Sequence, residues 1–505
     1  MFDNSTSNDA PRPSPFSIIG RFLLDPRAQG AVLTACAALM LFARAGSLPL
    51  PNYDDAYYAE KAKQMLRTGD WLTPRFAESI RLDNPPLFLW LMAATFAVAG
   101  VTAYAAVFWS ALSGVACVAL THRLTRRFGR EPFEAWAAGF VLLGTGYFLK
   151  YADHAMFDVF LTALFLCALL AYRRAWEGSA AAWAALGVFT GLGVLTKSVL
   201  GGFPLVVVMV HLLWSRRAWR SLREGAWLAP LLTLAVIAPW YGYQLVRHRA
   251  LFVEEHIAWL LVQRGTGSGA EAPPLRPFGY FRELAMTYWP WLPLAAVGLW
   301  MSVREAFTRR DAASGAWDDR ASARLLVTWP LVVIGVLSLA REKKLWYVMS
   351  VFPALAMLSA RALAAWWGRD RVRARVTLGG FAIATLAGLV LALTPWGSAP
   401  VRRPDLQRVA IAARSLVPPG ERIAFLGGNY WSVAHQFVFY SDRTLVRGAD
   451  DPVAVRAALD RGGWALLSTE AYALVAAADS TRYPRVDAAG QWVLVRLRAP
   501  SASRN

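Results

Sequence analysis

The chain has 505 residues, of which 56% are hydrophobic and only 17% are charged. This composition excludes an ordinary soluble protein, because the apolar residues come in long runs, each near the ~20 residues that a bilayer-spanning helix needs. The net charge of +19 is typical of the Lys and Arg excess in cytoplasmic loops of membrane proteins. Nucleic-acid binding is excluded, because the arginines lie in short loops and form no separate basic domain.

Three regions follow one another along the chain. Residues 1–27, rich in Ser, Pro and Asn, are predicted to be a disordered cytoplasmic N-terminus. Residues 28–396 are predicted to be an all-α polytopic membrane domain of about 11–13 transmembrane helices, with outer loops at 49–84 and 246–285. The predicted spans are 28–48, 103–121, 133–150, 156–172, 181–197, 199–214, 226–245, 286–303, 323–340, 345–364 and 376–396.

A further apolar helix, predicted at 85–101, decides the topology. Positively charged short loops belong in the cytoplasm. The arginine clusters, such as those at 123–130 and 216–223, all fall on that side only if 85–101 does not fully cross. We therefore expect a tilted or re-entrant helix packed on the outer side, and a C-terminus that faces outward. The outer loops hold the clustered acidic and aromatic residues, so the chemistry is expected on the outer face.

The pattern changes after residue 397, where the hydrophobic runs shorten to strand length. These runs are Ile423–Leu426, Phe437–Tyr440, Trp464–Ser468 and Trp492–Val495. Helical patterns at 452–460 and 470–478 lie between them. Residues 397–505 are therefore predicted to form a small soluble α/β domain on the outer side of the membrane.

The clearest chemical signature follows the first predicted span, where Asp54 and Asp55 stand side by side. Adjacent carboxylates at a membrane surface are costly unless they are solvated, paired or metal-bound. They could cap a helix that begins there and interact with its dipole. The alternative is a general base, or a metal-binding carboxylate beside a phosphate leaving group. The residues alone leave both alternatives open.

A second carboxylate, Asp158, is predicted to lie about one turn inside the fourth span, and an ionisable residue within a membrane helix is a functional-site hypothesis. A polar contact within the bundle is the alternative. The predicted topology places Asp54 and Asp158 on the same side of the membrane. This placement indicates a shared cavity.

Lysines stand at the outer ends of two spans: Lys197 between two helices, and Lys343 and Lys344 at the start of another. The positive-inside rule gives no benefit to lysines here. They could snorkel to lipid headgroups or clamp a lipid phosphate. In the long outer loop, Glu255 and His256 could bind a divalent ion or orient an acceptor, or they could belong to a solvated loop face.

An ordered set of motifs links these residues: an acidic pair, Tyr-Ala-Glu, Gly-Asp-Trp, Pro-Arg-Phe, and Pro-Pro before an apolar helix, all within 54–86. This order resembles that of the bacterial lipid A aminoarabinose transferases. It also resembles the wider superfamily that contains the dolichyl-phosphate-mannose protein mannosyltransferases. The match covers most of residues 30–360, and its later part consists of Asp158, Thr196, Lys197, Glu255, His256 and residues 344–347 with Pro353, Ala354 and Leu355.

The resemblance implies the GT-C fold of membrane glycosyltransferases, a polyprenyl-phosphate sugar donor and transfer with inversion. It implies that Asp54 occupies the position of the family's essential acidic residue, and that Lys197 and residues 343–347 face the donor phosphate. The aminoarabinose transferases usually carry Glu-Lys before Pro-Pro, where this chain has Asp83 and Asn84. The acidic side chain is kept and the cation is lost. Their Thr-Lys-Gly is Thr-Lys-Ser in this chain.

We expect the donor phosphate to be held by Lys197, Lys344 and Arg75, while Asp54 deprotonates an acceptor hydroxyl that attacks the anomeric carbon. Asp158 and Asp83 would shape the acceptor side or hold a metal. The predicted catalytic residues are Asp54, Asp55 and Asp158; the predicted substrate-binding residues are Tyr57, Tyr58, Arg75, Asp83, Asn84, Lys197, Arg264, Lys343, Lys344 and Tyr347; a divalent metal, if one is bound, is assigned to Glu255 and His256.

The expected partners are the polyprenyl-phosphate sugar, membrane lipids, and an acceptor that is a lipid A-like glycolipid, a glycan or a protein. The resemblance implies a bacterial inner membrane, with the site and the C-terminal domain facing the periplasm. A transporter or flippase for a lipid-linked saccharide is the alternative function. It would need charges within several spans and inverted repeats with broken helices. The sequence shows no such repeat, and the large outer loops fit an enzyme better.

Overall fold

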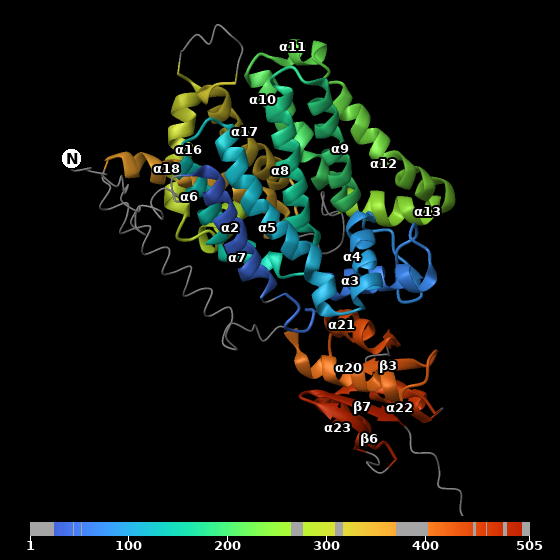
Figure 1. Ribbon diagram of the computed structural model, residues 1–505. Coiled ribbons are helices and arrows are strands. Elements are labelled where there is room, and N and C mark those ends of the chain that lie inside the picture. The colour runs from blue at the N-terminus through green and yellow to red at the C-terminus, as the bar shows by residue number, and fades with distance from the viewer. Residues whose placement is uncertain are drawn as a thin grey trace, which may run out of the picture.

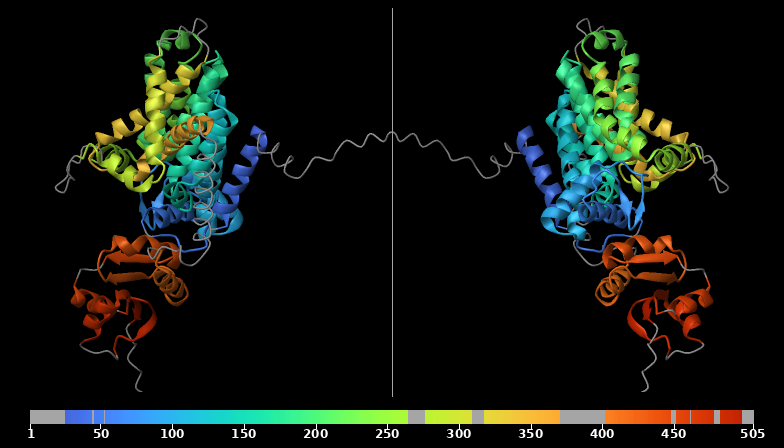
Figure 2. Two further views of the ribbon diagram at one scale, coloured as in Figure 1. Left: turned by 90° about the vertical axis from the view of Figure 1, so that its left-hand side faces the viewer. Right: turned by 90° about the vertical axis from the view of Figure 1, so that its right-hand side faces the viewer.

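The fold is a bundle of helices that carries a small sheet domain at one end (Figure 1). The computed structural model describes residues 25–43, 45–51, 53–263, 276–308, 317–369, 402–447, 451–460, 462–477 and 482–496. The predicted fold class, a helical membrane domain with a small C-terminal α/β domain, is confirmed. The two views of Figure 2 show that the sheet domain lies beyond the bundle and not beside it.

The elements of the bundle follow one another along the chain in two groups, which meet at the reversal after α9. The elements up to the first long reversal are α2 (Pro26–Phe42), α3 (Asp54–Thr68), β1 (Arg75–Phe76), β2 (Ser79–Ile80), α4 (Leu87–Ala99), α5 (Ala103–Arg127), α6 (Pro132–Leu143), α7 (Gly146–Ala152), α8 (Phe157–Ala175) and α9 (Ala180–Lys197). They are followed by η1 (Ser198–Gly202), α10 (Phe203–Trp214), α11 (Ala218–Arg223), α12 (Leu228–Arg247), α13 (Arg249–Phe252), η2 (Val253–Gln263), α15 (Gly279–Thr287), α16 (Leu292–Ala306), α17 (Asp319–Ser338), η3 (Leu345–Val351) and α18 (Phe352–Arg369).

Membrane-spanning length is reached by five helical stretches of the described chain. They are Ala103–Arg127, Ala180–Trp214, Leu228–Arg247, Asp319–Ser338 and Leu345–Trp367, and the bent pair α7 and α8 makes a sixth if it counts as one span. The stretch from Ala180 to Trp214 turns back on itself at Ser198, so it consists of two helices, as predicted. The predicted span at 376–396 lies outside the described residues.

Local signals start and stop the long helices. The Thr102 side chain accepts the Ala105 N–H at the start of α5, at 3.1 Å, and this bond satisfies a donor that the first turn leaves open. The last turn of α5 carries Arg126 and Arg127, whose charges face the negative end of the helix dipole. These signals fix the length of α5 at both ends.

The region 133–150 is not the single helix that the sequence predicted. It is broken at Gly144 and Thr145 into α6 and α7, and α7 is then bent by 107° against α8. Two glycines within three residues weaken a helix, and the bend is closed by the Met156 N–H, which donates to the His154 carbonyl at 2.8 Å. The break matters for function because it turns the α7–α8 corner towards the sheet-domain end.

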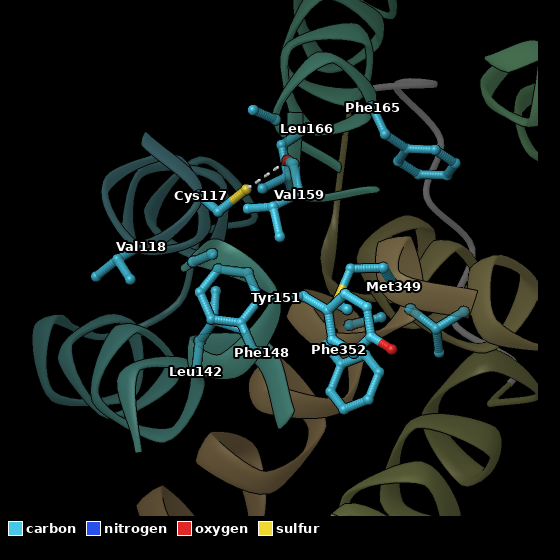
Figure 3. Close-up of a cluster of buried hydrophobic side chains, with 14 of the residues drawn as sticks. Cys117, Val118, Leu142, Phe148, Tyr151, Val159, Phe165, Leu166, Met349 and Phe352 are labelled. Carbon is cyan, nitrogen blue, oxygen red and sulfur yellow. Dashed lines mark hydrogen bonds between the residues drawn. The ribbon is translucent and has the colours of Figure 1, made fainter. Parts of the chain in front are cut away.

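Buried apolar side chains hold this corner in place (Figure 3). Phe148 and Tyr151 of α7 point into a cluster with Phe352 and Met349, which come from α18 and η3. Cys117 of α5 is fully buried and its thiol donates to the Val159 carbonyl of α8 at 3.6 Å. Elements that are far apart in the sequence therefore fix the corner through one core.

The short helix α4 stays at the sheet-domain end, which agrees with the prediction that 85–101 does not cross. Its 13 residues span about 20 Å, too short for the hydrocarbon core. Phe88 at its start lies 5.3 Å from Phe157 at the start of α8, ring centroid to centroid. Phe96 near its end lies 6.4 Å from Phe439 of the sheet domain.

The opposite end of the bundle carries the arginine-rich connections. Arg127 and Arg173 meet there, since the Arg173 side chain donates to the Arg127 carbonyl at 2.9 Å. Asp318 and Asp319, at the start of α17, line a surface groove together with Arg127 and Arg173. Figure 1 shows α11, with its own arginines, at this end and the sheet domain at the other. The bundle is thus polarised along its length.

The sheet domain is a five-stranded mixed sheet with helices against it. Strand order is β4-β3-β5-β7-β6, with the β4-β3-β5 part parallel and the β5-β7-β6 part antiparallel. Its elements are α20 (Pro404–Leu416), β3 (Arg422–Leu426), α21 (Trp431–Ser441), β4 (Thr444–Arg447), α22 (Pro452–Asp460), β5 (Trp464–Ser468), α23 (Thr469–Ala476), β6 (Arg485–Ala489) and β7 (Trp492–Arg496). The predicted strands at 423–426, 464–468 and 492–495 are present.

The fourth predicted strand is wrong, because Phe437–Tyr440 is the last part of helix α21. Every residue from Val433 to Phe439 is buried, since α21 packs on the sheet with one face and on α3 with the other. A run that is apolar on both faces has no period that separates a strand from a helix. The misassignment has a functional consequence, because α21 is the element that touches the bundle.

Ion pairs fasten α21 to α3. Lys63 of α3 donates to the Phe439 carbonyl and to Asp442, each at 2.7 Å. Asp442 also lies 3.0 Å from Arg67 of α3 and 3.0 Å from Arg414 of α20. On the other side of the junction, Arg402 pairs with Asp153 of the α7–α8 corner at 2.9 Å. The sheet domain is therefore held against the candidate site region described below.

The pH dependence of this junction follows from Asp442. Its burial alone would raise the pKa, but Lys63, Arg67 and Arg414 together hold the pKa of Asp442 below its usual value. Stability from a lowered carboxyl pKa is complete above the unfolded value of about 3.9 and is lost as the pH falls through the still lower folded pKa. Protection of α21 from hydrogen exchange is therefore expected to persist from pH 7 to pH 5.

The Asp442→Asn variant checks this expectation. It should lower the exchange protection of α21 at neutral pH, since Lys63 would lose the charge it pairs with. The matched control is Glu470→Gln, an exposed carboxylate in α23, and it should leave protection unchanged. Wild-type protection that declines already between pH 7 and pH 5 would contradict the role of Asp442.

Candidate functional site

The first turn of α3 carries Asp54 and Asp55, and the two carboxylates have different surroundings. Asp55 is buried: its Oδ1 accepts the Ala155 backbone N–H at 2.6 Å, and its Oδ2 lies 3.0 Å from Nδ1 of His154. Both partners belong to the α7–α8 corner, so Asp55 ties α3 to that corner. Asp54 is half-buried, which makes it the more accessible of the two acids.

Tyr151 of α7 lies between the surroundings of Asp55 and the start of η3. Its ring stacks on that of His154, the partner of Asp55, at a centroid distance of 5.4 Å. The Tyr151 ring lies 5.8 Å, centroid to centroid, from the ring of Trp346 in η3. The acidic start of α3, the start of α8 and the start of η3 therefore meet at the sheet-domain end, on the same side of the bundle as the predicted topology requires.

A cation joins this neighbourhood through Asp158. This residue lies in the first turn of α8, nearer the helix start than predicted, and is only 2% exposed. Lys197 donates to its Oδ1 at 2.6 Å, and the same ammonium lies 5.1 Å from the centroid of the Tyr347 ring. Oδ2 of Asp158 has no hydrogen-bond partner among the described residues. The site thus has an acid at its surface and a lysine–carboxylate pair behind it.

A tight reversal of the chain presents Lys197. Ser198, the next residue, has a φ of +47°, and η1 packs back against α9. A Cβ placed on Gly201 would lie 2.0 Å from the carbonyl carbon of Gly193, so only glycine fits there. The close approach keeps Lys197 at the tip of the reversal, directed towards α8.

The variant Gly201→Ala is expected to destabilise the protein by about 1–3 kcal/mol, because the added methyl group must push η1 away from α9. A lower thermal unfolding temperature in detergent measures the effect. Gly202→Ala is the matched control, since nothing lies within 4 Å of a Cβ at that neighbouring position. Equal stability of the two variants would contradict the packing described.

A second cation was missed by the sequence reasoning. Lys61 of α3 is fully buried and donates to Asp83, to Asn84 Oδ1 at 3.1 Å, and lies 4.4 Å from the centroid of the Tyr57 ring. The Tyr57 hydroxyl also reaches Asp83, at 3.2 Å. Burial lowers the pKa of Lys61, and the charge of Asp83 opposes this shift. The cation that the sequence lacks at position 84 is therefore supplied from another element.

The signal for Lys61 was present but weak. Tyr57 and Lys61 are four residues apart in α3, so they share one face of the helix. The neighbouring residues Ala56, Ala59 and Ala62 are also buried. A lysine within a buried stretch needs a partner for its charge. The partner, Asp83, lies beyond the hairpin of β1 and β2, and the distance between Lys61 and Asp83 cannot be inferred from the sequence.

Glu255 and His256 hold the loop before α4. Glu255 lies 3.0 Å from Arg81 and accepts the Leu82 backbone N–H at 2.7 Å. His256 Nδ1 lies 2.9 Å from the Leu82 carbonyl, and its Nε2 lies 3.2 Å from the Ser198 hydroxyl. The described residues contain no group of three or more His, Cys, Asp or Glu side chains that could hold a metal ion. Metal binding by Glu255 and His256 stays a prediction.

The lysines before η3 differ in their contacts. Lys343 donates to the Ala340 carbonyl, which closes the turn after α17. Lys344 has a side chain that is 42% exposed, with its ammonium 3.9 Å from Glu342. Of the two, Lys344 is the one that a ligand can reach without breaking a hydrogen bond to the backbone.

Three further predicted binding residues lie elsewhere or cannot be placed. Tyr58 is buried and its ring stacks on Phe157 at 3.9 Å, so it supports the start of α8. Arg75 in β1 lies 4.0 Å from Asp70 and makes no ion pair with the carboxylates of the α7–α8 corner. Arg264 lies outside the described residues.

A groove of about 340 Å³ between α5, α8 and α9 lies at the arginine-rich end. Arg123 and Arg174 stand at its edge and apolar residues such as Leu120, Leu170 and Phe189 line it. Its lining contains no carboxylate, so it has no candidate base. It belongs to the other end of the bundle and is no part of the site.

Comparison with known proteins shows which proteins the chain is similar to. Residues 83–243 match the family model described as dolichyl-phosphate-mannose-protein mannosyltransferase. The undecaprenyl phosphate-alpha-4-amino-4-deoxy-L-arabinose arabinosyl transferase of Pseudomonas aeruginosa is 29% identical over 393 residues, which is 74% of this chain and 67% of the relative. A transferase with the same description from Pseudomonas fluorescens is 28% identical over 334 residues, covering 63% of this chain and 54% of that one.

Solved structures agree with these matches. ArnT from Cupriavidus metallidurans bound to undecaprenyl phosphate superposes with a TM-score of 0.74 at 21% identity, covering 92% of this chain and 97% of that chain. The chain is similar in sequence to these membrane glycosyltransferases and has the fold of the ArnT structure. An oligosaccharyltransferase from Archaeoglobus fulgidus has the same fold more distantly, with a TM-score of 0.59, 12% identity, and coverage of 88% of this chain and 70% of that one. This similarity favours the enzyme over the transporter.

Proposed function

We propose that this protein transfers a sugar from a polyprenyl-phosphate carrier to a hydroxyl group of an acceptor on the sheet-domain side of the membrane. The observation that carries the proposal is that the acidic start of α3 and the Asp158–Lys197 pair border the same α7–α8 corner: Asp55 binds His154 and Ala155 there, and Lys197 donates to Asp158 at 2.6 Å. An accessible carboxylate suits a general base, and a lysine suits a lipid phosphate. The relatives named above support the polyprenyl-phosphate donor and favour a pentose as the first sugar to test.

The bond changes follow from this arrangement. Asp54 accepts the proton of the acceptor hydroxyl, whose oxygen forms a bond to the anomeric carbon of the donor. The bond between that carbon and the phosphate oxygen breaks, and the electron pair leaves with the polyprenyl phosphate. Attack from the face opposite the phosphate inverts the anomeric centre. Lys197 and Lys344 stabilise the charge that develops on the leaving phosphate.

Purified protein in nanodiscs tests the proposal. With a polyprenyl-phosphate pentose and a lipid A-like acceptor, we expect release of polyprenyl phosphate together with a glycosylated acceptor. Absence of both products, with every donor sugar tried, would overturn the assignment. Treatment with a chelator decides whether a divalent ion takes part: loss of turnover that Mg²⁺ or Zn²⁺ restores would establish one, and unchanged turnover would exclude it.

The proposed orientation places the sheet domain in the periplasm of a bacterial inner membrane. The arginine-rich connections would then face the cytoplasm, as the positive-inside rule favours. A cysteine at position 470 in α23 should react with a membrane-impermeant reagent in intact cells with a permeable outer membrane. A cysteine at position 219 in α11 should react only after lysis, and the reverse pattern would contradict the orientation.

A further inference from the structure

Five aromatic rings meet where α3 touches the sheet domain. His435 of α21 lies at the centre, with centroid distances of 5.0 Å to Tyr57, 5.2 Å to Phe76, 5.7 Å to Trp431 and 6.0 Å to Tyr53. Tyr57 and Phe76 are largely covered. The group joins the start of the bundle's candidate site to the start of α21, and the mechanism above uses none of its members.

Two of the rings are open to solvent. Tyr53 is 51% exposed and Trp431 is 46% exposed, although large aromatic side chains gain most from burial. Tyr53 also has a φ of +71°, a region that residues with a Cβ rarely occupy and that is costly to hold. Tyr53 immediately precedes Asp54, so the strained residue sets the ring directly beside the proposed base.

His435, at the centre of the group, has a ring nitrogen without a hydrogen-bond partner among the described residues. His435 is 9% exposed, and its Nδ1 has no hydrogen-bond partner among the described residues. Burial lowers the pKa of His435 to about 4, and Asp83 and Lys61 act on it in opposite directions. The imidazole is therefore neutral at pH 7, and Nδ1 can serve a ligand that offers a hydroxyl group. A buried polar atom without a partner is rare in native proteins.

We propose that Tyr53, Trp431 and His435 form a platform that binds a saccharide ring of the acceptor. A sugar ring has an apolar face of C–H groups and a rim of hydroxyls, which fits two exposed aromatic rings that both neighbour an uncharged histidine. This inference rests on the proposed function, because it names the class of acceptor that Asp54 deprotonates. The acceptor is accordingly a glycolipid or glycan, and not a protein.

Other occupants fit the platform less well. The donor phosphate needs cations. The Lys197 ammonium lies against Asp158 of α8 and Tyr347 of η3, whereas the platform lies where α3 contacts α21. A belt of aromatic residues at the membrane surface stands at the ends of spanning helices. Trp431 instead begins α21 of the sheet domain, and its ring neighbours are Tyr430 and His435.

Binding of a soluble probe separates the platform from catalysis. The probe is an unacylated, phosphate-free glucosamine disaccharide, added to the full-length protein in nanodiscs without donor, and its affinity is followed by saturation-transfer NMR. Trp431→Ala and Tyr53→Ala are each expected to weaken binding about tenfold, the value of one stacking contact. Trp431→Phe should keep most of the affinity. His435→Phe keeps the aromatic packing but removes the nitrogen, and it should weaken binding severalfold.

The matched control is Trp219→Ala in α11, which removes a tryptophan that is 82% exposed at the opposite end of the bundle. It should leave binding unchanged, and thermal unfolding of every variant shows that the fold is retained. No binding of the disaccharide to the wild type at millimolar concentration would overturn the platform. So would unchanged binding in both alanine variants, or a Tyr53→Ala defect that appears only in the KM of the donor.

The two proposals can fail separately. If the wild type releases no polyprenyl phosphate from any donor while Trp431→Ala still loses the disaccharide, the proposed function is wrong and the platform stands. If sugar transfer proceeds and a Ser-rich peptide, not the disaccharide, becomes glycosylated, the transfer stands and the platform is wrong.

Discussion

Asp54→Asn is expected to lower the turnover number of sugar transfer by a factor of about 10²–10⁴, because asparagine keeps the shape of the side chain but cannot accept the acceptor's proton. The KM for the donor should change little, since the phosphate is assigned to Lys197 and Lys344. Initial rates of polyprenyl phosphate release in nanodiscs measure both constants. Near-normal turnover of Asp54→Asn would remove this residue from the role of base.

Asp55→Asn provides the contrast that the structure makes possible. Its carboxylate accepts the Ala155 N–H and contacts His154, so its loss should loosen the junction of α3 with the α7–α8 corner. We expect a lower unfolding temperature for Asp55→Asn and an unchanged one for Asp54→Asn. Glu470→Gln should be normal in both measurements. A stable, inactive Asp55→Asn together with an active Asp54→Asn would reverse the assignment.

The helical bundle could be predicted from the sequence, because spanning helices depend on local information. Long apolar runs mark spanning helices whatever their partners, and the short run at 85–101 was placed by a charge argument that concerns whole loops. The motif order around Asp54 lies within one continuous segment. These features need no knowledge of which distant residues touch.

Contacts between segments that are distant in the sequence could not be predicted. Glu255 and His256 suggested a metal because the two residue types stand side by side, yet their partners Arg81 and Leu82 lie far earlier in the chain. Lys61 is paired across the β1–β2 hairpin. Such pairings follow from packing, and periodicity within one helix does not contain them.

The helix α21 illustrates a different limit. Its residues Phe437–Tyr440 were predicted to be a strand, because a short apolar run without period fits either element. With a strand there, His435 would have been assigned to a loop before it. Only the helix places His435 two turns ahead of Asp442, so that one residue reaches the aromatic group and the other reaches Lys63.

The pair of Asp158 and Lys197 combines structural and functional roles that a double variant can separate. Lys197→Met leaves a carboxylate that is 2% exposed without its counter-charge, and breaking a buried pair in this way costs about 3–5 kcal/mol. The double variant Asp158→Leu/Lys197→Met removes both charges together. It should recover most of the thermal stability, because an apolar pair can replace a buried ion pair at little cost.

Recovered stability should not bring recovered function. If Lys197 holds the donor phosphate, the double variant lacks a charge-assisted contact, and its KM for the donor should rise at least about tenfold. Arg220→Met is the matched control, since it breaks the exposed pair with Glu224 in α11 and should change stability by less than about 1 kcal/mol. A stable double variant with a normal donor KM would show that Lys197 serves only to neutralise Asp158, and the phosphate would then have to be held by Lys344 without it.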